Sequence, residues 1–190
     1  MGAVSPSPYE TDLLRDQIMS TIINPVAKGM AAEGCPYNGV LYAGLMLTED
    51  GPKVIEFNCR FGDPEAQVVL PRLKSDFLSA VLTVVEGGLE NFDLRWTDQT
   101  AVTVVMAADG YPGSYQKGQP IHGADQLKTA NGSLIFHAGT ESADDGQLIS
   151  AGGRVLAATA LGNDKQQARR AAYATVKTIF WPGAMFRNDI

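Results

Sequence analysis

The feature that most restricts the fold of this chain is a pair of strand-like runs separated by a short turn. The first run covers residues 39–48 (GVLYAGLMLT) and the second covers residues 53–61 (KVIEFNCRF). The connecting residues, Glu49-Asp50-Gly51-Pro52, are types that favour a turn. Two such runs with so short a connection predict an antiparallel hairpin. Because the first run is apolar at both alternating sets of positions, we expect other parts of the protein to cover the hairpin.

The second run carries a row of polar side chains on one face. Successive side chains of a strand point to opposite faces, so Glu56, Asn58 and Arg60 share a face. Side chains two residues apart are separated by roughly 6.6 Å, which lets the first two reach one ion. Two interpretations are open: the solvated face of an edge strand, or a site where oxygen ligands hold a cation and arginine grips an anion. The turn Gly62-Asp63-Pro64-Glu65 adds carboxylates at the same end and favours the second. The opposite face, which we expect to be core, consists of Ile55, Phe57, Cys59 and Phe61.

The rest of the chain shows two different sequence patterns, a mainly helical one followed by one of short strands. The first part is expected to be a loop over residues 1–9, a helix over 10–33 divided near Pro25, a helix in two pieces over 65–70 and 76–86, and a connector over 91–98. The second part reads as short strands between glycine-rich turns, over 101–107, 133–138 and 155–160, followed by a helix over 165–179. This change predicts one domain over residues 1–94 and another over residues 95–190.

Composition excludes several function classes. A net charge of −6 argues against general binding to nucleic acid or to a membrane surface, both of which attract basic patches. No apolar run approaches the roughly 20 residues that a membrane helix needs, and the start MGAVSPSP lacks the pattern of a secretory signal. The two cysteines, Cys35 and Cys59, are expected to be free thiols. We therefore expect a cytoplasmic protein.

The polar row lies inside a longer pattern that resembles a known family. Glu-x-Asn-x-Arg resembles the distal metal strand of ATP-grasp ligases. The strings YNGVLYAGLM and VIEFNCRFGDPE, together with MGAVSPSP, FHAGT, GGRVL and the terminal FRNDI, resemble the glycinamide ribonucleotide synthetase (phosphoribosylamine–glycine ligase) family over the whole chain. The resemblance implies an α/β (α+β) fold: the carboxy-terminal half of an ATP-grasp domain with an antiparallel sheet, then a small α+β domain.

The resemblance also implies an activity. The family joins glycine to 5-phosphoribosylamine while ATP becomes ADP, through an acyl phosphate, in purine biosynthesis. Carried over by position, Glu56 and Asn58 would hold Mg²⁺ or Mn²⁺ against the ATP phosphates. Arg60 would stabilise the transferred phosphoryl group or the acyl phosphate, and Asp63 would orient the amine substrate or the neighbouring loop. The loop containing Ser5 and Pro6 would lie near the nucleotide phosphates and the substrate.

Three departures from the family pattern bear on this assignment. Residues 39–48 lack the second acidic metal ligand found in many ATP-grasp enzymes, and Val4 replaces a usual tyrosine. The resemblance begins in the middle of the family's chain, so the ATP-holding lysines of its amino-terminal half have no counterpart. We therefore expect activity to need that half, in the same or a separate chain. The alternatives are a non-catalytic remnant that serves as a docking subunit, and a different ATP-grasp carboxylate–amine ligase.

The remaining polar candidates have weaker signals. A histidine in a strand-and-turn context is more often structural than a ligand, which applies to His122 and to His137. The neighbours Gly139 and Thr140 offer contacts to a substrate or simply form a turn. Arg154 either pairs with an acid, which we favour, or approaches the cleft, and Arg169-Arg170 is expected to lie on the solvated face of the last helix.

Overall fold

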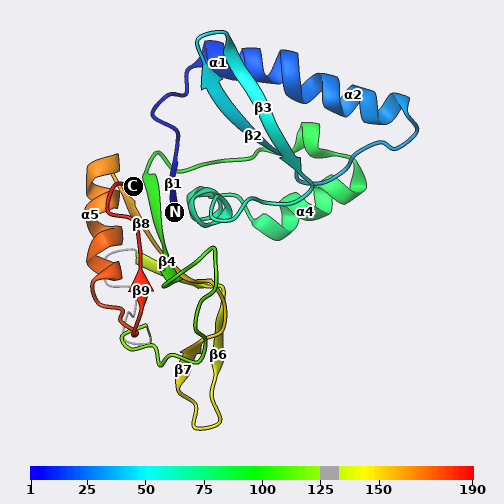
Figure 1. Cartoon of the computed structure of the whole chain (residues 1–190). Helices are drawn as coiled ribbons and strands as arrows, with labels where there is room; N and C mark the ends of the chain where they lie inside the picture. The colour runs from blue at the N-terminus through cyan, green and yellow to red at the C-terminus, as the bar shows by residue number, and fades with distance from the viewer. Residues whose placement is uncertain (125–132) are drawn as a thin grey trace. The chain divides into compact units, whose positions relative to one another are not determined.

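The computed structural model describes residues 1–124 and 133–190, which form helices and antiparallel sheets, as the predicted fold class requires (Figure 1). Contacts along the chain define two units. The C-terminal unit comprises residues 1–6, 63–72 and 97–190, and the hairpin unit comprises residues 7–62 and 73–96. The chain last passes between the units after Trp96, close to the predicted boundary near residue 95. The domains 1–94 and 95–190 stay a prediction, because residues 1–6 and 63–72 group with the later part of the chain.

The C-terminal unit is built on one antiparallel sheet. Its strands are ordered β1 (Gly2–Ser5), β4 (Thr100–Ala108), β8 (Arg154–Gly162) and β5 (Ser133–His137), and the short β9 (Ala184–Met185) pairs with the end of β4. The three strands predicted in this region are therefore confirmed.

The expectation that residues 1–9 form only a loop is wrong for β1. This segment pairs with the edge of β4, with Gly2 opposite Val104. The pairing is close, since a Cβ added to Gly2 would lie 2.5 Å from the Thr103 carbonyl oxygen. A strand that depends on so distant a partner leaves no local signal in its own residues.

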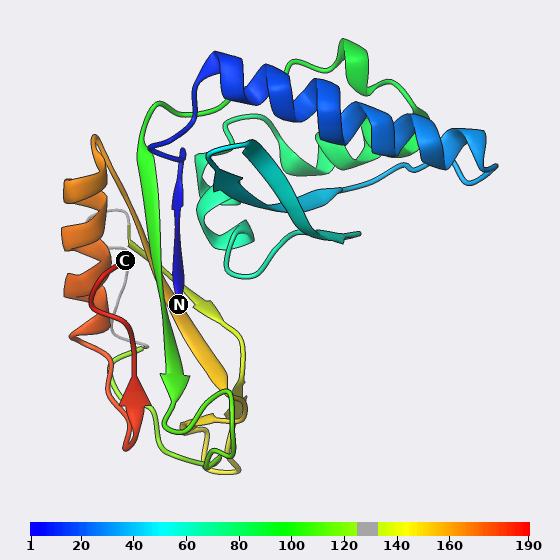
Figure 2. The ribbon, with the colours of Figure 1, turned by 45° about the horizontal axis from the view of Figure 1, so that its top comes forward.

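Helices cover both faces of the central strands β4 and β8, whose residues are almost all buried. Helix α5 (Lys165–Val176) runs along the sheet in Figure 2 and contacts β4, β8 and β5. It begins at Asp164, whose side chain accepts a hydrogen bond from the Gln167 backbone N–H. The other face meets the short α3 (Ala66–Val69), which is followed by the 3₁₀ turn η2 (Leu70–Arg72) and carries the buried Val68. The core beneath α5 includes Val102, Val104, Met106, Leu156, Ala158 and Ala160.

The hairpin unit begins with one continuous helical segment. It consists of α1 (Asp12–Ile18), the π-helical η1 (Met19–Ile23) and α2 (Asn24–Ala32). The Thr11 side chain caps the start by accepting from the Leu14 backbone N–H. Pro25 lies in the first turn of α2, directly after the π-helical η1, so the helix changes type beside this residue but is not divided there as the sequence predicted.

The predicted hairpin is present as β2 (Tyr42–Thr48) and β3 (Gly51–Asn58). The expectation that it is covered is wrong within the described residues. Met46 is 55% exposed, and the supposed core residues Ile55 and Phe57 are 63% and 39% exposed, while Cys59 is exposed too. In the described part of the chain these two strands pair only with each other, so the sheet keeps two free edges and much of its surface is uncovered.

The remaining helices match their sequence signals. Helix α4 (Phe77–Glu86) is capped by Asp76 and ends at Gly87, whose φ of 76° suits glycine. The 3₁₀ turn η3 (Leu89–Asn91) leads into the predicted connector. Two further short strands, β6 (Thr140–Ser142) and β7 (Leu148–Ser150), form a second hairpin in the C-terminal unit. Within residues 1–124 and 133–190, no helix combines the length and apolar character needed to span a membrane.

Candidate metal and phosphate site

The polar row on β3 begins with two side chains that touch. The Asn58 amide donates from Nδ2 to Glu56 Oε1 at 2.9 Å, which shows that the two side chains share a face as predicted. Across the hairpin, Gly44 pairs with Glu56 and Tyr42 pairs with Asn58. A Cβ on Gly44 would lie 3.1 Å from the Glu56 Cγ, so glycine at this position leaves room for the carboxylate.

The donor set fits a hard divalent cation only in part. A carboxylate and an amide carbonyl are the oxygen ligands that Mg²⁺ and Mn²⁺ take. Among the described residues, however, no group of three or more His, Cys, Asp or Glu side chains gathers as a metal site. Mg²⁺ is commonly held by one or two protein oxygens together with substrate phosphates and water. Glu56 and Asn58 therefore suit an ion that arrives with a phosphorylated substrate.

Arg60 lies beyond the strand rather than on it. Strand β3 ends at Asn58, three residues short of the predicted end, and the chain bends at residues 59 and 60. The register shift of the hairpin lies before the row, because Gly44 pairs with Glu56 while Leu45 pairs with Val54, and the pairing from Glu56 to Asn58 is regular. The Arg60 guanidinium donates from Nη1 to the Phe61 carbonyl at 2.8 Å, and in the described part of the chain it forms no ion pair. It thus remains an exposed cation with donors left for an anion.

A phenol lies near the end of the row. Tyr37 donates to the Val40 carbonyl at 2.7 Å, and desolvation, with a smaller contribution from the Cys59 thiol beside it, raises the pKa of this phenol. A neutral phenol adds no charge to the site.

Asp63 belongs to the C-terminal unit and is fully engaged there. Its Oδ2 pairs with Arg154 Nη2 at 2.8 Å, and its Oδ1 accepts from Gln67 Nε2 at 2.8 Å. Its backbone carbonyl also accepts from Arg154 Nη1 at 2.8 Å. The sequence-based expectation that Arg154 pairs with an acid is confirmed. These bonds give Asp63 an evident part in holding the turn that follows Gly62.

Ser5 ends β1 in the same unit. Its hydroxyl oxygen accepts from Arg72 Nη1 at 2.7 Å, and Pro6, which follows, is exposed. Arg72 also donates to the carbonyls of Gln99 at 2.9 Å and Thr97 at 3.2 Å. Sequence reasoning missed Arg72 and Gln67, because partners so distant along the chain leave no local pattern.

The FHAGT and GGRVL motifs meet through their backbones. A Cβ on Gly139 would lie 2.5 Å from the Gly152 Cα, and a Cβ on Gly153 would lie 2.1 Å from the Tyr111 ring. His137 is exposed and contacts the Thr140 hydroxyl, Nδ1 to Oγ1 at 3.0 Å. The motif glycines therefore have a packing role.

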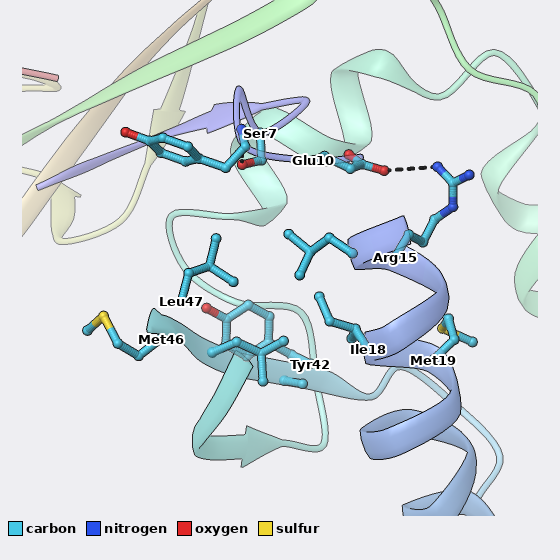
Figure 3. Close-up of a pocket in the computed structure, with 12 residues that line it drawn as sticks. Ser7, Glu10, Arg15, Ile18, Met19, Tyr42, Met46 and Leu47 are labelled. Atoms are coloured by element: carbon cyan, nitrogen blue, oxygen red, sulfur yellow. Dashed lines mark hydrogen bonds and ion pairs between the residues drawn. The ribbon is translucent and has the colours of Figure 1, made fainter. Parts of the chain in front are cut away.

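The hairpin unit also contains an apolar hollow of about 770 Å³ beside α1 and β2 (Figure 3). The cationic side chain at its rim, Arg15, is already paired with two carboxylates, those of Glu10 at 3.2 Å and Asp12 at 2.7 Å. Such a surface offers nothing suited to a metal or a phosphate. The apolar lining consists of Leu14, Ile18, Met19, Ala43, Leu45, Met46 and Leu47.

Comparisons with known proteins agree with the motifs. The profile described as "Phosphoribosylglycinamide synthetase, ATP-grasp (A) domain" matches residues 1–66, and that described as "Phosphoribosylglycinamide synthetase, C domain" matches residues 101–190. The phosphoribosylamine–glycine ligase of Salmonella typhimurium is 50% identical over 191 residues, which are 100% of this chain and 44% of the relative. The chloroplastic ligase of Arabidopsis thaliana is 49% identical, with 36% of its length covered. The chain thus spans less than half the length of these relatives.

Solved structures show the same fold. The crystal structure of phosphoribosylamine–glycine ligase from Thermotoga maritima matches with a TM-score of 0.84 and 35% identity, over 100% of this chain and 46% of that one. A biotin carboxylase domain from Hydrogenobacter thermophilus, at 16% identity, matches with a TM-score of 0.68 and covers 98% of this chain, which shows a shared fold only. The predicted resemblance and fold class are confirmed: the chain belongs to the phosphoribosylglycinamide synthetase family and carries part of its ATP-grasp domain together with its C domain.

Proposed function

We propose that this chain supplies the metal- and phosphate-binding residues for the ATP-dependent joining of glycine to 5-phosphoribosylamine. The observation that carries the proposal is the Glu56–Asn58 pair on β3, two oxygen-bearing side chains in contact on one face, with Arg60 two residues further on. This order of groups suits a nucleotide whose phosphates bring a cation with them.

The reaction has two steps. A glycine carboxylate oxygen attacks the γ-phosphorus of ATP, the bond to the β–γ bridging oxygen breaks, and glycyl phosphate and ADP form. The amine nitrogen of phosphoribosylamine then attacks the glycyl carbonyl carbon. The bond from this carbon to the bridging oxygen of glycyl phosphate breaks, phosphate leaves with that oxygen, and the nitrogen loses a proton to solvent or a nearby base. Such transfers depend mainly on positioning and on charge stabilisation by the protein.

The residues divide these tasks. Glu56 and Asn58 would hold Mg²⁺ or Mn²⁺, which when bound neutralises phosphate charge. The Arg60 guanidinium would grip the transferred phosphoryl group with two N–H donors. Asp63 would keep the following turn in place for the amine substrate, a part that its bonds to Arg154 and Gln67 support.

Two more residues and a partner complete the proposal. Ser5, held by Arg72, and Pro6 would border the phosphates and the substrate. The partner is the amino-terminal half of the family's enzyme, in the same or a separate chain, acting in the cytoplasm. The coverage of 44% of the Salmonella typhimurium relative supports a need for that half.

A second function, a non-catalytic docking subunit, is compatible with the same structure. Apolar side chains of the hairpin unit are well exposed, with Val85 75% exposed and Leu78 65% exposed. Exposed apolar patches often mark surfaces that bind another protein. A covering partner is expected under both functions, so only activity separates them.

A chimera tests the proposal directly. This chain would replace the 191 matched residues of the Salmonella typhimurium ligase, which is feasible because the match covers the whole chain. ADP formation that requires ATP, glycine and phosphoribosylamine supports the ligase, and Glu56→Gln should abolish most of it. A folded chimera that forms no ADP would favour the docking subunit, and ADP formation with another carboxylate or amine in place of glycine or phosphoribosylamine would favour a different ligase.

A further inference from the structure

The chain passes between its two units at four points. These crossings lie between Pro6 and Ser7, Gly62 and Asp63, Arg72 and Leu73, and Trp96 and Thr97. Four crossings in one chain mean that any relative motion of the units must be absorbed at these short segments. The residues that fix the backbone beside the crossings therefore decide where a hinge can bend.

Arg72 holds three of the crossings on the side of the C-terminal unit. Its guanidinium donates to the Ser5 hydroxyl at 2.7 Å, to the Thr97 carbonyl at 3.2 Å and to the Gln99 carbonyl at 2.9 Å. Arg72 itself borders the third crossing, and its own carbonyl accepts from the Thr97 backbone N–H at 2.8 Å. One planar group thus ties three chain segments together.

Arg154 holds the remaining crossing, the one between Gly62 and Asp63. It binds both the carboxylate and the backbone carbonyl of Asp63, each at 2.8 Å. A fully extended chain spans at most about 3.6 Å per residue, so the Cα of Arg60 stays within roughly 11 Å of the Cα of Asp63 whatever the units do. Fixing Asp63 therefore limits how far Arg60 can move from the GGRVL segment.

Two of the crossings also run side by side. On the hairpin-unit side, the Lys74 N–H donates to the Arg95 carbonyl at 2.8 Å, and Leu73 forms a β-bridge with Trp96. The buried Ser75 continues the ribbon by accepting from the Arg95 N–H at 2.7 Å. This ribbon fixes the two crossings to one another within the hairpin unit, as Arg72 fixes them within the C-terminal unit.

We propose that Arg72 and Arg154 are positioning residues that anchor all four crossings on the C-terminal unit and so limit the movement of the chain segments that lead into the hairpin unit. The importance of this anchoring for phosphate binding by Arg60 rests on the proposed function. The anchoring itself does not depend on that function. A lysine cannot replace either anchor, because three donors on one tetrahedral nitrogen cannot reach acceptors spread around a planar guanidinium.

The test is a distance measurement on the 190-residue chain, which needs no activity. Spin labels would be placed on Cys35 in the hairpin unit and on Asp144→Cys in the C-terminal unit, in a Cys59→Ser background. Pulsed electron–electron double resonance then gives the distribution of distances between the two labels. We expect Arg72→Lys and Arg154→Lys to broaden the distribution and shift its mean relative to the parent.

Arg169→Lys is the matched control. Arg169 also lies in the C-terminal unit and donates to two backbone carbonyls, those of Ile190 at 2.6 Å and Asn188 at 2.7 Å, but at none of the crossings. The Arg169→Lys variant should lose about as much stability as Arg72→Lys and Arg154→Lys, and its distribution of inter-label distances should match that of the parent. Equal distributions for the parent and for folded Arg72→Lys and Arg154→Lys would overturn the proposal, as would equal broadening in Arg169→Lys. Because the readout is structural, its failure is separate from a failure of the ligase assay.

Discussion

The Asn58 amide nitrogen lies 2.9 Å from Glu56 Oε1, so the amide and the carboxylate on β3 fix one another's orientation. This bond leaves Glu56 Oε2 and Asn58 Oδ1 as acceptors on neighbouring positions of one face. Two such oxygens suit a cation that also binds phosphates, which is the basis of the proposed site.

Replacing Arg60 should affect the chemical step. In the chimera, Arg60→Lys keeps the positive charge but loses the paired N–H donors that match a phosphoryl group. We expect kcat to fall by roughly 10²–10³-fold, the range for losing one charge-stabilising donor, with a smaller change in KM for ATP. Steady-state ADP formation measures both constants. Arg170→Lys, on the exposed side of α5, is the control and should behave as the parent.

The Asp63–Arg154 pair should contribute measurably to stability. Both side chains are partly exposed, at 40% and 33%, and the pair is linked by charged hydrogen bonds. Asp63→Asn and Arg154→Gln should each lower the free energy of unfolding by about 1–2 kcal/mol. Urea unfolding of the two single variants and the double variant gives the coupling energy. Strictly additive effects would show that the two side chains do not stabilise one another.

A buried hydroxyl pair gives a test of the C-terminal core. Thr159 donates to Thr103 at 2.7 Å, Oγ1 to Oγ1, and both residues are fully buried on adjacent strands. Thr103→Val leaves the Thr159 hydroxyl without its acceptor and should cost about 1–3 kcal/mol. The double variant with Thr159→Val removes both hydroxyls. It should recover the part of the loss that comes from the stranded Thr159 hydroxyl, but not the part from the bond that Thr103 donates to the Ala158 carbonyl at 3.5 Å. If thermal unfolding shows the double variant to be less stable than Thr103→Val, the Thr159 hydroxyl is not stranded by the single substitution.

The start of α4 should weaken in acid. Hydrogen bonds from the Ser79 side chain and backbone N–H lower the pKa of Asp76 below its usual 3.8. A folded-state pKa below the unfolded value means that the cap stabilises at pH above the unfolded pKa, and that this stabilisation is lost as pH falls through the folded pKa. Asp76→Asn caps without titrating. The stability of the parent relative to Asp76→Asn should therefore decrease as the pH is lowered past 3.8, as followed by urea unfolding. A constant difference across this range would contradict the assignment.

Local signals made much of the fold predictable. The hairpin, the first helical segment and the helix over residues 76–86 depend on residues close together in the chain. Contacts across long separations were not predictable: Arg154 and Asp63 are 91 residues apart, and Arg72 and Ser5 are 67 apart. No single-sequence pattern records such pairs.

The sequence predicted the arrangement of the site residues on β3, Glu56 and Asn58, better than that of Arg60, which lies beyond the end of the strand. Strand alternation placed Glu56 beside Asn58, and their hydrogen bond agrees. It also extended the row to Arg60, although β3 ends at Asn58. The apolar residues of the hairpin suggested that other parts of the protein cover it. Such residues indicate that covering the surface would be favourable, but they do not show that another segment covers it. In the described part of the chain, Ile55 is 63% exposed.

The most direct test of the metal assignment is the concentration of Mg²⁺ that gives half-maximal ADP formation by the chimera. Glu56→Gln removes the one anionic ligand of the proposed pair, so this concentration should rise at least about tenfold, and Asn58→Ala should raise it by a smaller factor. Glu86→Gln, at the exposed end of α4, should leave it unchanged. If Glu56→Gln and Asn58→Ala are active with the parent's Mg²⁺ requirement, Glu56 and Asn58 do not hold the metal and the account of the site is wrong.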